Sequence, residues 1–160
     1  MNILFIAPLP PPITGHSNVS NSLFLYLNKI HKLKVINLSL GSNHNGKVTL
    51  IRLWQFCIII LKIIYYSRNI DRIYITISES IAGNIKDIIL YLLTWRLNSR
   101  TIIHLHGGSF QKGVLNRSVF LKYLNKKLLY RIGAVIISGP SHSKIFNKLI
   151  SNKNVHIIQV

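Results

Sequence analysis

Apolar residues fall along this chain in two alternating kinds of segment. Short runs rich in β-branched side chains predict buried strands, and longer segments with apolar side chains every three or four residues predict helices. The predicted strands cover residues 2–7, 33–40, 71–77, 101–104, 134–137 and 155–160. The predicted helices lie within residues 17–30, 49–67, 81–92, 116–131 and 141–150. Strands that alternate with helices at this spacing predict an α/β fold with a doubly wound parallel sheet, in a single domain over residues 1–160.

Three of the predicted helices carry specific expectations about burial. The first has a core-facing stripe formed by Val19, Leu23, Leu27 and Ile30. The second, residues 49–67, has polar side chains on only one narrow face, which favours burial in the core over contact with a membrane. The fourth is expected to point three apolar side chains inward, namely Phe120, Leu124 and Leu128.

The loop after the first strand, Pro8–His16, contains three consecutive prolines, which predict an extended, stiff conformation. Gly15 permits the turn that opens the next helix, and the capping candidates are Ser17, Asn18 and Ser20. A helix that begins directly after a strand presents N–H groups and a positive dipole end to an anion. The alternative is an ordinary strand–loop–helix connection.

The segment Thr101–Ser109 reads Thr-Ile-Ile-His-Leu-His-Gly-Gly-Ser, a buried strand that stops abruptly at two glycines. Such a strand places an imidazole and accessible backbone N–H groups at the carboxyl edge of the sheet, where open α/β sheets bind ligands. Gly107 and Gly108 allow close backbone approach, and His106 can donate a hydrogen bond near neutral pH. The alternative is a simple turn with a histidine satisfied by a carbonyl group.

Charge is the strongest feature of the composition. The chain has 20 Lys and Arg residues against 3 Asp and Glu residues, a formal net charge of +17. This imbalance predicts an anionic partner, such as a membrane leaflet, a phosphorylated small molecule or nucleic acid. The abundance of Ile, Asn and Lys is also typical of AT-rich coding sequence, which would raise the lysine content without any binding role. Cys57 is the only cysteine, which excludes a disulfide framework.

The chain shows no signal of secretion or membrane insertion. Met1 leads directly into a predicted strand, and no uninterrupted apolar run approaches the ~20 residues that span a bilayer. We therefore expect a cytoplasmic protein that rests peripherally on the inner face of the cell membrane. Nucleic acid is a less favoured partner, because zinc fingers, RNA-recognition strands and basic arms are all absent from the sequence.

The sequence disfavours two nucleotide-binding motifs. Residues 41–47 match the start of a phosphate-binding P-loop, but Val48 stands where the magnesium-binding hydroxyl is required. No Gly-x-Gly-x-x-Gly follows the first strand, which disfavours a dinucleotide oxidoreductase.

The histidines of the chain suggest two further kinds of site. His104 and His106 share one strand face, but a third ligand is not evident, so we expect no metal cofactor. Ser141 and His142 follow a Gly-Pro turn in the manner of a nucleophile elbow, although helix capping explains the serine better.

Several segments together resemble the N-terminal half of family 4 glycosyltransferases, retaining enzymes with the GT-B fold. The resembling segments are residues 3–16, 75–84, 104–109 and 138–149, which occur in the family's order and cover essentially the whole chain. The resemblance implies a Rossmann-like acceptor-binding domain that faces a second domain holding a nucleotide-sugar. The enzyme would transfer a hexosyl group to a saccharide or lipid-linked acceptor in the synthesis of surface polysaccharide or glycolipid.

The resemblance also implies roles for individual residues. The residues matched to donor or acceptor binding are Gly15, His16, Ser78, Glu79, Gly83, Gly107 and Gly108. Gly15 and His16 would lie beside the donor phosphates, whereas Ser78, Glu79 and Gly83 would line the acceptor side. His106 is matched to the histidine that touches the transferred sugar, and is the candidate catalytic residue.

The family's second domain, with its paired glutamates, has no counterpart in these residues. We therefore expect a fragment or a split gene whose C-terminal domain acts in cis or in trans, and expect this chain to be inactive alone. One alternative is a non-catalytic basic module that binds an anionic membrane or nucleic acid. A weaker alternative is a small protein that binds a phosphorylated ligand at the loop after the first strand.

Overall fold

The computed structural model describes residues 1–39, 50–146, 149 and 155–157, which divide into two compact units, residues 1–74 and 75–160. The strands are β1 (Asn2–Ala7), β2 (Lys32–Asn37), β3 (Arg72–Thr76), β4 (Thr101–Leu105), β5 (Ala134–Ile137) and β6 (Val155–Ile157). The helices are α1 (Gly15–Ile30), α2 (Leu50–Tyr66), α3 (Ile81–Leu93), α4 (Val119–Leu129) and α5 (Ser143–Phe146). The hydrogen-bonded strand order is β2-β1-β3-β4-β5-β6, and β3 contains the boundary between the units. The predicted α/β fold, a Rossmann-like parallel sheet flanked by helices, is confirmed.

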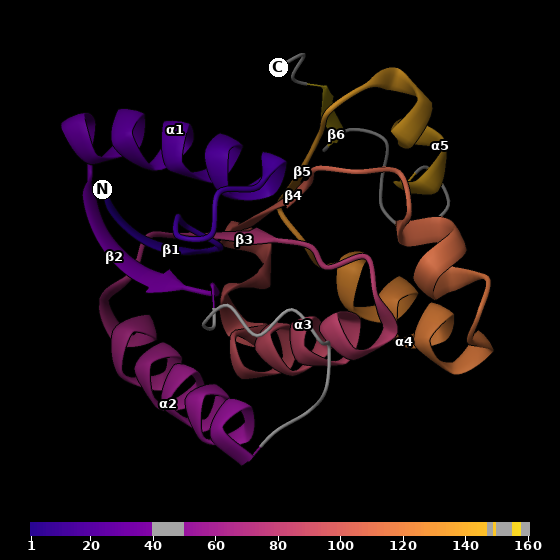
Figure 1. The fold of residues 1–160 in the computed structure, drawn as a ribbon, viewed down its shortest axis with the longest axis horizontal. Coiled ribbons are helices and arrows are strands. Elements are labelled where there is room, and N and C mark those ends of the chain that lie inside the picture. The colour runs from indigo at the N-terminus through magenta and orange to yellow at the C-terminus, as the bar shows by residue number, and fades with distance from the viewer. Residues whose placement is uncertain (40–49, 147–148, 150–154, 158–160) are drawn as a thin grey trace. The chain divides into compact units, whose positions relative to one another are not determined.

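In the first unit, β1 and β2 pair in parallel from Asn2 opposite Lys32 to Ala7 opposite Asn37. Figure 1 shows α1 and α2 on opposite faces of this strand pair. The ring of Phe5 stacks on Tyr74 with their centroids 4.6 Å apart. Because β1 is buried almost throughout, its continuous apolar sequence is what a strand covered on both faces requires.

The start of α1 differs from the sequence-based prediction. Thr14, not a residue of the predicted set, is the N-cap, and it forms a reciprocal capping box with Ser17. The peptide bonds Pro10–Pro11 and Pro11–Pro12 are both cis. The predicted stripe is also only partly correct, because Ile30 is exposed.

Helix α2 contradicts the expectation that it is buried. The side chains of Ile59 and Ile63 are buried, whereas Trp54 is 69% exposed, and other apolar side chains of the helix are exposed as well. Within the described part of the chain, the structure contains no helix with the length and apolar character needed to cross a membrane. The P-loop candidate, residues 41–47, lies outside the described residues.

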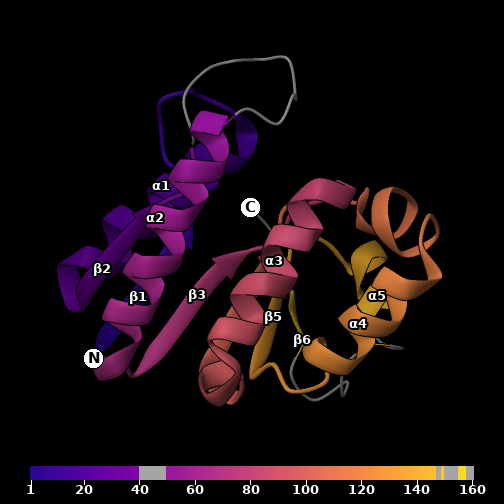
Figure 2. The ribbon, with the colours of Figure 1, turned by 90° about the horizontal axis from the view of Figure 1, so that it is seen from below.

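In the second unit, β4, β5 and β6 form parallel pairs, with Ile102 opposite Ala134 and Val135 opposite Val155. Helices α3 and α4 pack side by side on one face of these strands, and α5 lies on the other (Figures 1 and 2). A π-helix, Gln111–Leu115, precedes α4, and short 3-10 helices flank other elements at Ser67–Asn69, Trp95–Arg100 and Pro140–His142.

Two expectations about the second unit are wrong. Phe120 does not point inward, because its side chain is 68% exposed. The buried face of α4 is formed by Leu121, Asn125, Leu128 and Leu129. The helix expected over residues 141–150 begins later than expected, because Pro140–His142 forms a 3-10 turn and α5 starts at Ser143; residues 147, 148 and 150 lie outside the described residues.

Candidate functional site

The structure brings most of the predicted site residues together where β3 and β4 end. The Ile77 amide donates to the His104 carbonyl over 2.9 Å, so the two strand ends are direct neighbours in the second unit. Ser78 and Glu79 follow β3, and residues 106–108 follow β4. Because parallel strands end at one edge of a sheet, these residues share the edge at which α/β proteins bind ligands.

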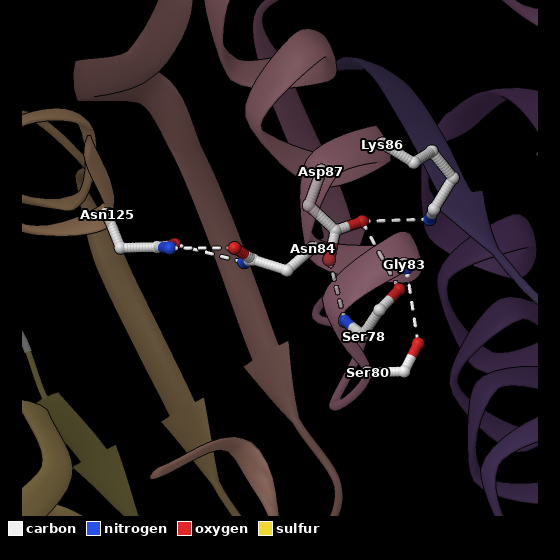
Figure 3. A network of polar contacts seen from close by, with 7 residues as sticks. All are labelled: Ser78, Ser80, Gly83, Asn84, Lys86, Asp87 and Asn125. Carbon is white, nitrogen blue, oxygen red and sulfur yellow. Dashed lines mark hydrogen bonds and ion pairs between the residues drawn. The ribbon is translucent and has the colours of Figure 1, made fainter. Parts of the chain in front are cut away.

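Ser78 is held in place by Asp87, a residue of α3. Its amide donates to Asp87 Oδ2 over 2.7 Å and its hydroxyl lies 3.4 Å from Asp87 Oδ1 (Figure 3). Asp87 is fully buried, and its charge is balanced by Lys86, whose Nζ lies 2.8 Å from Oδ1. A buried carboxylate with a cation and an N–H donor is well satisfied, so the turn after β3 is rigidly positioned.

Gly83 explains how this turn approaches the helix so closely. Ser80 caps α3 by accepting a hydrogen bond from the Gly83 amide over 3.2 Å (Figure 3). A Cβ atom on Gly83 would lie 2.5 Å from Ser78 Cβ, which is far inside van der Waals contact. The glycine is therefore required for packing, whatever role it has toward a ligand.

Glu79 is wrapped by the loop that follows β4. Its Oε2 accepts a hydrogen bond from the Ser109 amide over 3.0 Å. The Glu79 carboxylate lies where a side chain on Gly107 would be, and the Glu79 carbonyl oxygen lies where one on Gly113 would be. Among the described residues, the buried Oε1 of Glu79 has no hydrogen-bond partner. This carboxylate therefore fixes the glycine loop with one oxygen, while its other oxygen is buried beside Gly107.

His106 is partly buried beside His104, with the two ring centroids 3.9 Å apart. The prediction that these two histidines share a strand face is thereby confirmed. The Ser138 hydroxyl, at the end of β5, donates to the His106 carbonyl over 3.1 Å, which holds the end of β4. The part of the chain that the structure describes contains no cluster of three or more His, Cys, Asp or Glu side chains suited to a metal ion.

His142 belongs to the same edge, although it is not among the predicted site residues. Its Nε2 lies 2.8 Å from the position that a Cβ of Gly108 would take. A side chain at position 108 would therefore require this imidazole to move. The available signal was the position of His142 directly after a strand and a Gly-Pro turn, which is again the carboxyl edge of the sheet.

Gly15 and His16 lie in the first unit, in the first turn of α1. A side chain on Gly15 would have open space around it, and its backbone shows no positive φ, so the expected conformational need for glycine is wrong. The Ser17 amide in this turn is already bonded to Thr14 Oγ1 at 3.1 Å, which reduces the donors available to an anion.

Comparison with known proteins adds no relative. No protein family model matches this chain, and no curated protein matches it either.

Proposed function

We propose that this chain is the acceptor-side, N-terminal domain of a retaining glycosyltransferase of family 4. The observation that carries the proposal is the edge formed by Ser78, Glu79 and the His-Gly-Gly turn. This edge combines a carboxylate oxygen that has no hydrogen-bond partner among the described residues, an imidazole and a glycine backbone without side chains. Sugar hydroxyls are recognised by such mixed acceptors and donors at close backbone approach.

Each residue has a distinct part in this proposal. Glu79 accepts a hydrogen bond from an acceptor hydroxyl, while its Oε2 keeps the glycine loop in position. Gly107 and Gly108 let the Glu79 carboxylate and the His142 imidazole lie against the backbone of the turn. His106 donates a hydrogen bond to the transferred sugar. In the complete enzyme, Gly15 and His16 would face the donor phosphates, and the donor domain would be supplied in cis or in trans.

Saccharide binding tests the proposal directly. Saturation-transfer NMR with the intact chain and the methyl glycosides of glucose, galactose and N-acetylglucosamine should detect at least one ligand. The Glu79→Gln and His106→Ala variants should lose this signal because they remove one acceptor and one donor. His156→Ala, which changes an exposed histidine on β6, is the matched control. The proposal is wrong if all three variants bind as the parent chain does, or if none of the sugars binds it.

Transfer by the complete enzyme provides the second test. His106→Ala should abolish transfer of label from a nucleotide-sugar while the folded state is kept, as judged by circular dichroism. Near-normal turnover in that variant would remove His106 from the catalytic role.

A non-catalytic basic module is the second candidate, and one observation favours it. The chain has 20 lysines and arginines against three carboxylates, and one of these, Asp87, is buried in an ion pair with Lys86. The surface charge of the lysines and arginines is therefore largely uncompensated. This function would show salt-sensitive binding to an anionic surface without dependence on a sugar.

A further inference from the structure

The outward face of α4 carries tyrosine and lysine side chains in one continuous row. We call this row the α4 stripe, and define it as Val119, Tyr123, Lys126, Lys127 and Tyr130, all of which are exposed. The two tyrosines are 61% and 74% exposed. Their positions repeat at helical spacing on the side of α4 away from its buried residues. The core therefore does not account for these aromatic side chains.

The stripe continues beyond the end of α4 into a cluster around Trp95. The guanidinium of Arg131 lies 5.6 Å from the Trp95 ring centroid, and that of Arg96 lies 5.7 Å from it. Half of the Trp95 surface is nonetheless exposed. Tryptophan, tyrosine, lysine and arginine are the side chains that favour the membrane–water boundary, since each joins an apolar body to a polar end.

An apolar groove lies between α3 and α4, on the other side of Phe120 from the stripe. Its walls include Ile81, Ile85 and Leu124 together with Phe120, and nearly all of its exposed lining is apolar. A phosphate group forms no favourable interaction with such a lining. Hydrocarbon that packs against it is removed from water, which is favourable. The groove therefore favours a lipid surface over nucleic acid as the partner of this face.

The charged side chains of α4 are all positive. Helix α4 contains lysines and no acidic residue. The second unit's carboxylates, Glu79 and Asp87, are bonded within the turn after β3 and within α3. An anionic surface would thus meet several cations without a repelling carboxylate on the helix.

We propose that the α4 stripe and the Trp95 cluster dock the protein on an anionic phospholipid bilayer. The lysines and arginines lie at the phosphate level, the tyrosines and Trp95 insert at the boundary, and the groove beside Phe120 accepts acyl-chain carbon. This contact does not depend on the proposed transferase activity. It would, however, bring a lipid-linked acceptor to the same membrane surface as the chain.

Vesicle co-sedimentation tests the proposal with the intact chain. Phosphatidylcholine vesicles that contain phosphatidylglycerol should bind the chain, whereas pure phosphatidylcholine vesicles should not. Lys126→Gln with Lys127→Gln should lower the partition constant by about 25-fold, since each cation contributes roughly fivefold at an anionic surface. Tyr123→Ser with Tyr130→Ser should lower it by about fivefold or more through lost apolar burial.

Matched pairs in the first unit serve as controls. Lys29→Gln with Lys32→Gln removes the same charge from exposed positions, and Tyr26→Ser with Tyr65→Ser removes two exposed tyrosines. Both pairs should change binding by less than about twofold, within ordinary surface effects. An equal loss in the control pairs would show that net charge alone directs binding, and would overturn the proposal.

Two further results would also overturn it: failure of the parent chain to bind anionic vesicles, or tighter binding of a DNA oligonucleotide that is lost in the same α4 variants. Saccharide binding measured on these variants separates the two proposals. The α4 substitutions are expected to leave it unchanged, because Ser78, Glu79 and His106 are untouched.

Discussion

Helices α2 and α3 are both strongly apolar, yet they are used in opposite ways. Helix α2 buries Ile59 and Ile63 and leaves much of its apolar surface exposed, including Trp54. Helix α3 buries two polar side chains, Asn84 and Asp87, completely. The apolar content of a helix therefore does not determine how much of it is buried. The elements that pack against the helix determine how much of it is buried.

The polar residues of α3 can be buried because each of them forms hydrogen bonds or an ion pair with neighbouring side chains or backbone. The Asn84 amide donates to Asn125 Oδ1 over 3.1 Å, and the Asn125 amide donates back over 2.8 Å (Figure 3). Asp87 is bonded to Ser78 and Lys86, and thereby links the core of α3 to the candidate site. Burial of these groups is tolerated because their hydrogen bonds are complete.

The largest expected effect comes from Asp87→Ala. This substitution leaves the Ser78 amide and Lys86 without their buried partner, and should lower the free energy of unfolding by about 3–5 kcal/mol. Asp71→Ala, at an exposed carboxylate that also accepts a backbone hydrogen bond, should cost about 1 kcal/mol. Urea denaturation measures both. Similar losses of unfolding free energy at the two positions would show that the buried carboxylate of α3 stabilises the fold no more than an exposed one.

Adjacent isoleucines of α2 provide the next test. Ile63 is fully buried and Ile64 is 46% exposed. Ile63→Ala should cost about 3 kcal/mol, since it removes buried methylene groups and leaves a cavity. Ile64→Ala should change stability by about 0.5 kcal/mol or less. Equal costs from thermal or urea unfolding would mean that the exposed face of α2 is covered in solution.

The asparagine pair of α3 and α4 should show a smaller, coupled effect. Asn84→Ala should cost about 2 kcal/mol, because it leaves the buried Asn125 amide without one of its partners. A double-mutant cycle with Asn125→Ala should return a coupling energy of about 1–3 kcal/mol. Simple additivity of the two losses would show that the pair does not act as a unit.

Alkaline pH should produce the smallest effect. Burial, and then the charge of Asp87, raise the pKa of Tyr91 well above its usual value of 10.0. Because the folded-state pKa is the higher one, the stability from this residue is complete below pH 10 and is lost as the pH rises further. The loss is about 1.4 kcal/mol per pH unit for one tyrosine.

Tyr91→Phe should therefore make unfolding less sensitive to pH above 10. Near pH 7 the substitution should change stability little, because the buried Tyr91 hydroxyl has no partner among the described residues. Chemical denaturation of the parent and variant at both pH values measures the difference. An unchanged slope above pH 10 would contradict the burial of Tyr91 in solution.

Much of the fold followed from sequence pattern, and the errors have a common cause. The strand Ala134–Ile137 was predicted to the residue, because a short β-branched run between turns has few alternatives. Phe120 was placed inward and most of α2 was expected in the core, since both expectations relied on apolar character alone. Which face of each helix is buried depends on the elements that pack against it, and the sequence pattern of the helix does not reveal that packing.

The candidate site was predictable in part for a similar reason. Ser78, Glu79 and His106 follow strands, and the carboxyl ends of parallel strands meet at one edge, so their proximity could be expected. The closure of the loop over Glu79 and the position of His142 against Gly108 depend on contacts between residues far apart in the chain. No spacing in the sequence encodes such contacts.

The sequence by itself determined the alternation of strands and helices, the cationic character and the glycines at the strand ends. These are local properties, set by side-chain shape, charge and backbone freedom. The tertiary structure alone decided which faces are buried, how Asp87 supports the turn after β3, and that tyrosines and lysines share the outward face of α4. These features arise from packing between distant segments, where the free energy depends on which partners each side chain meets.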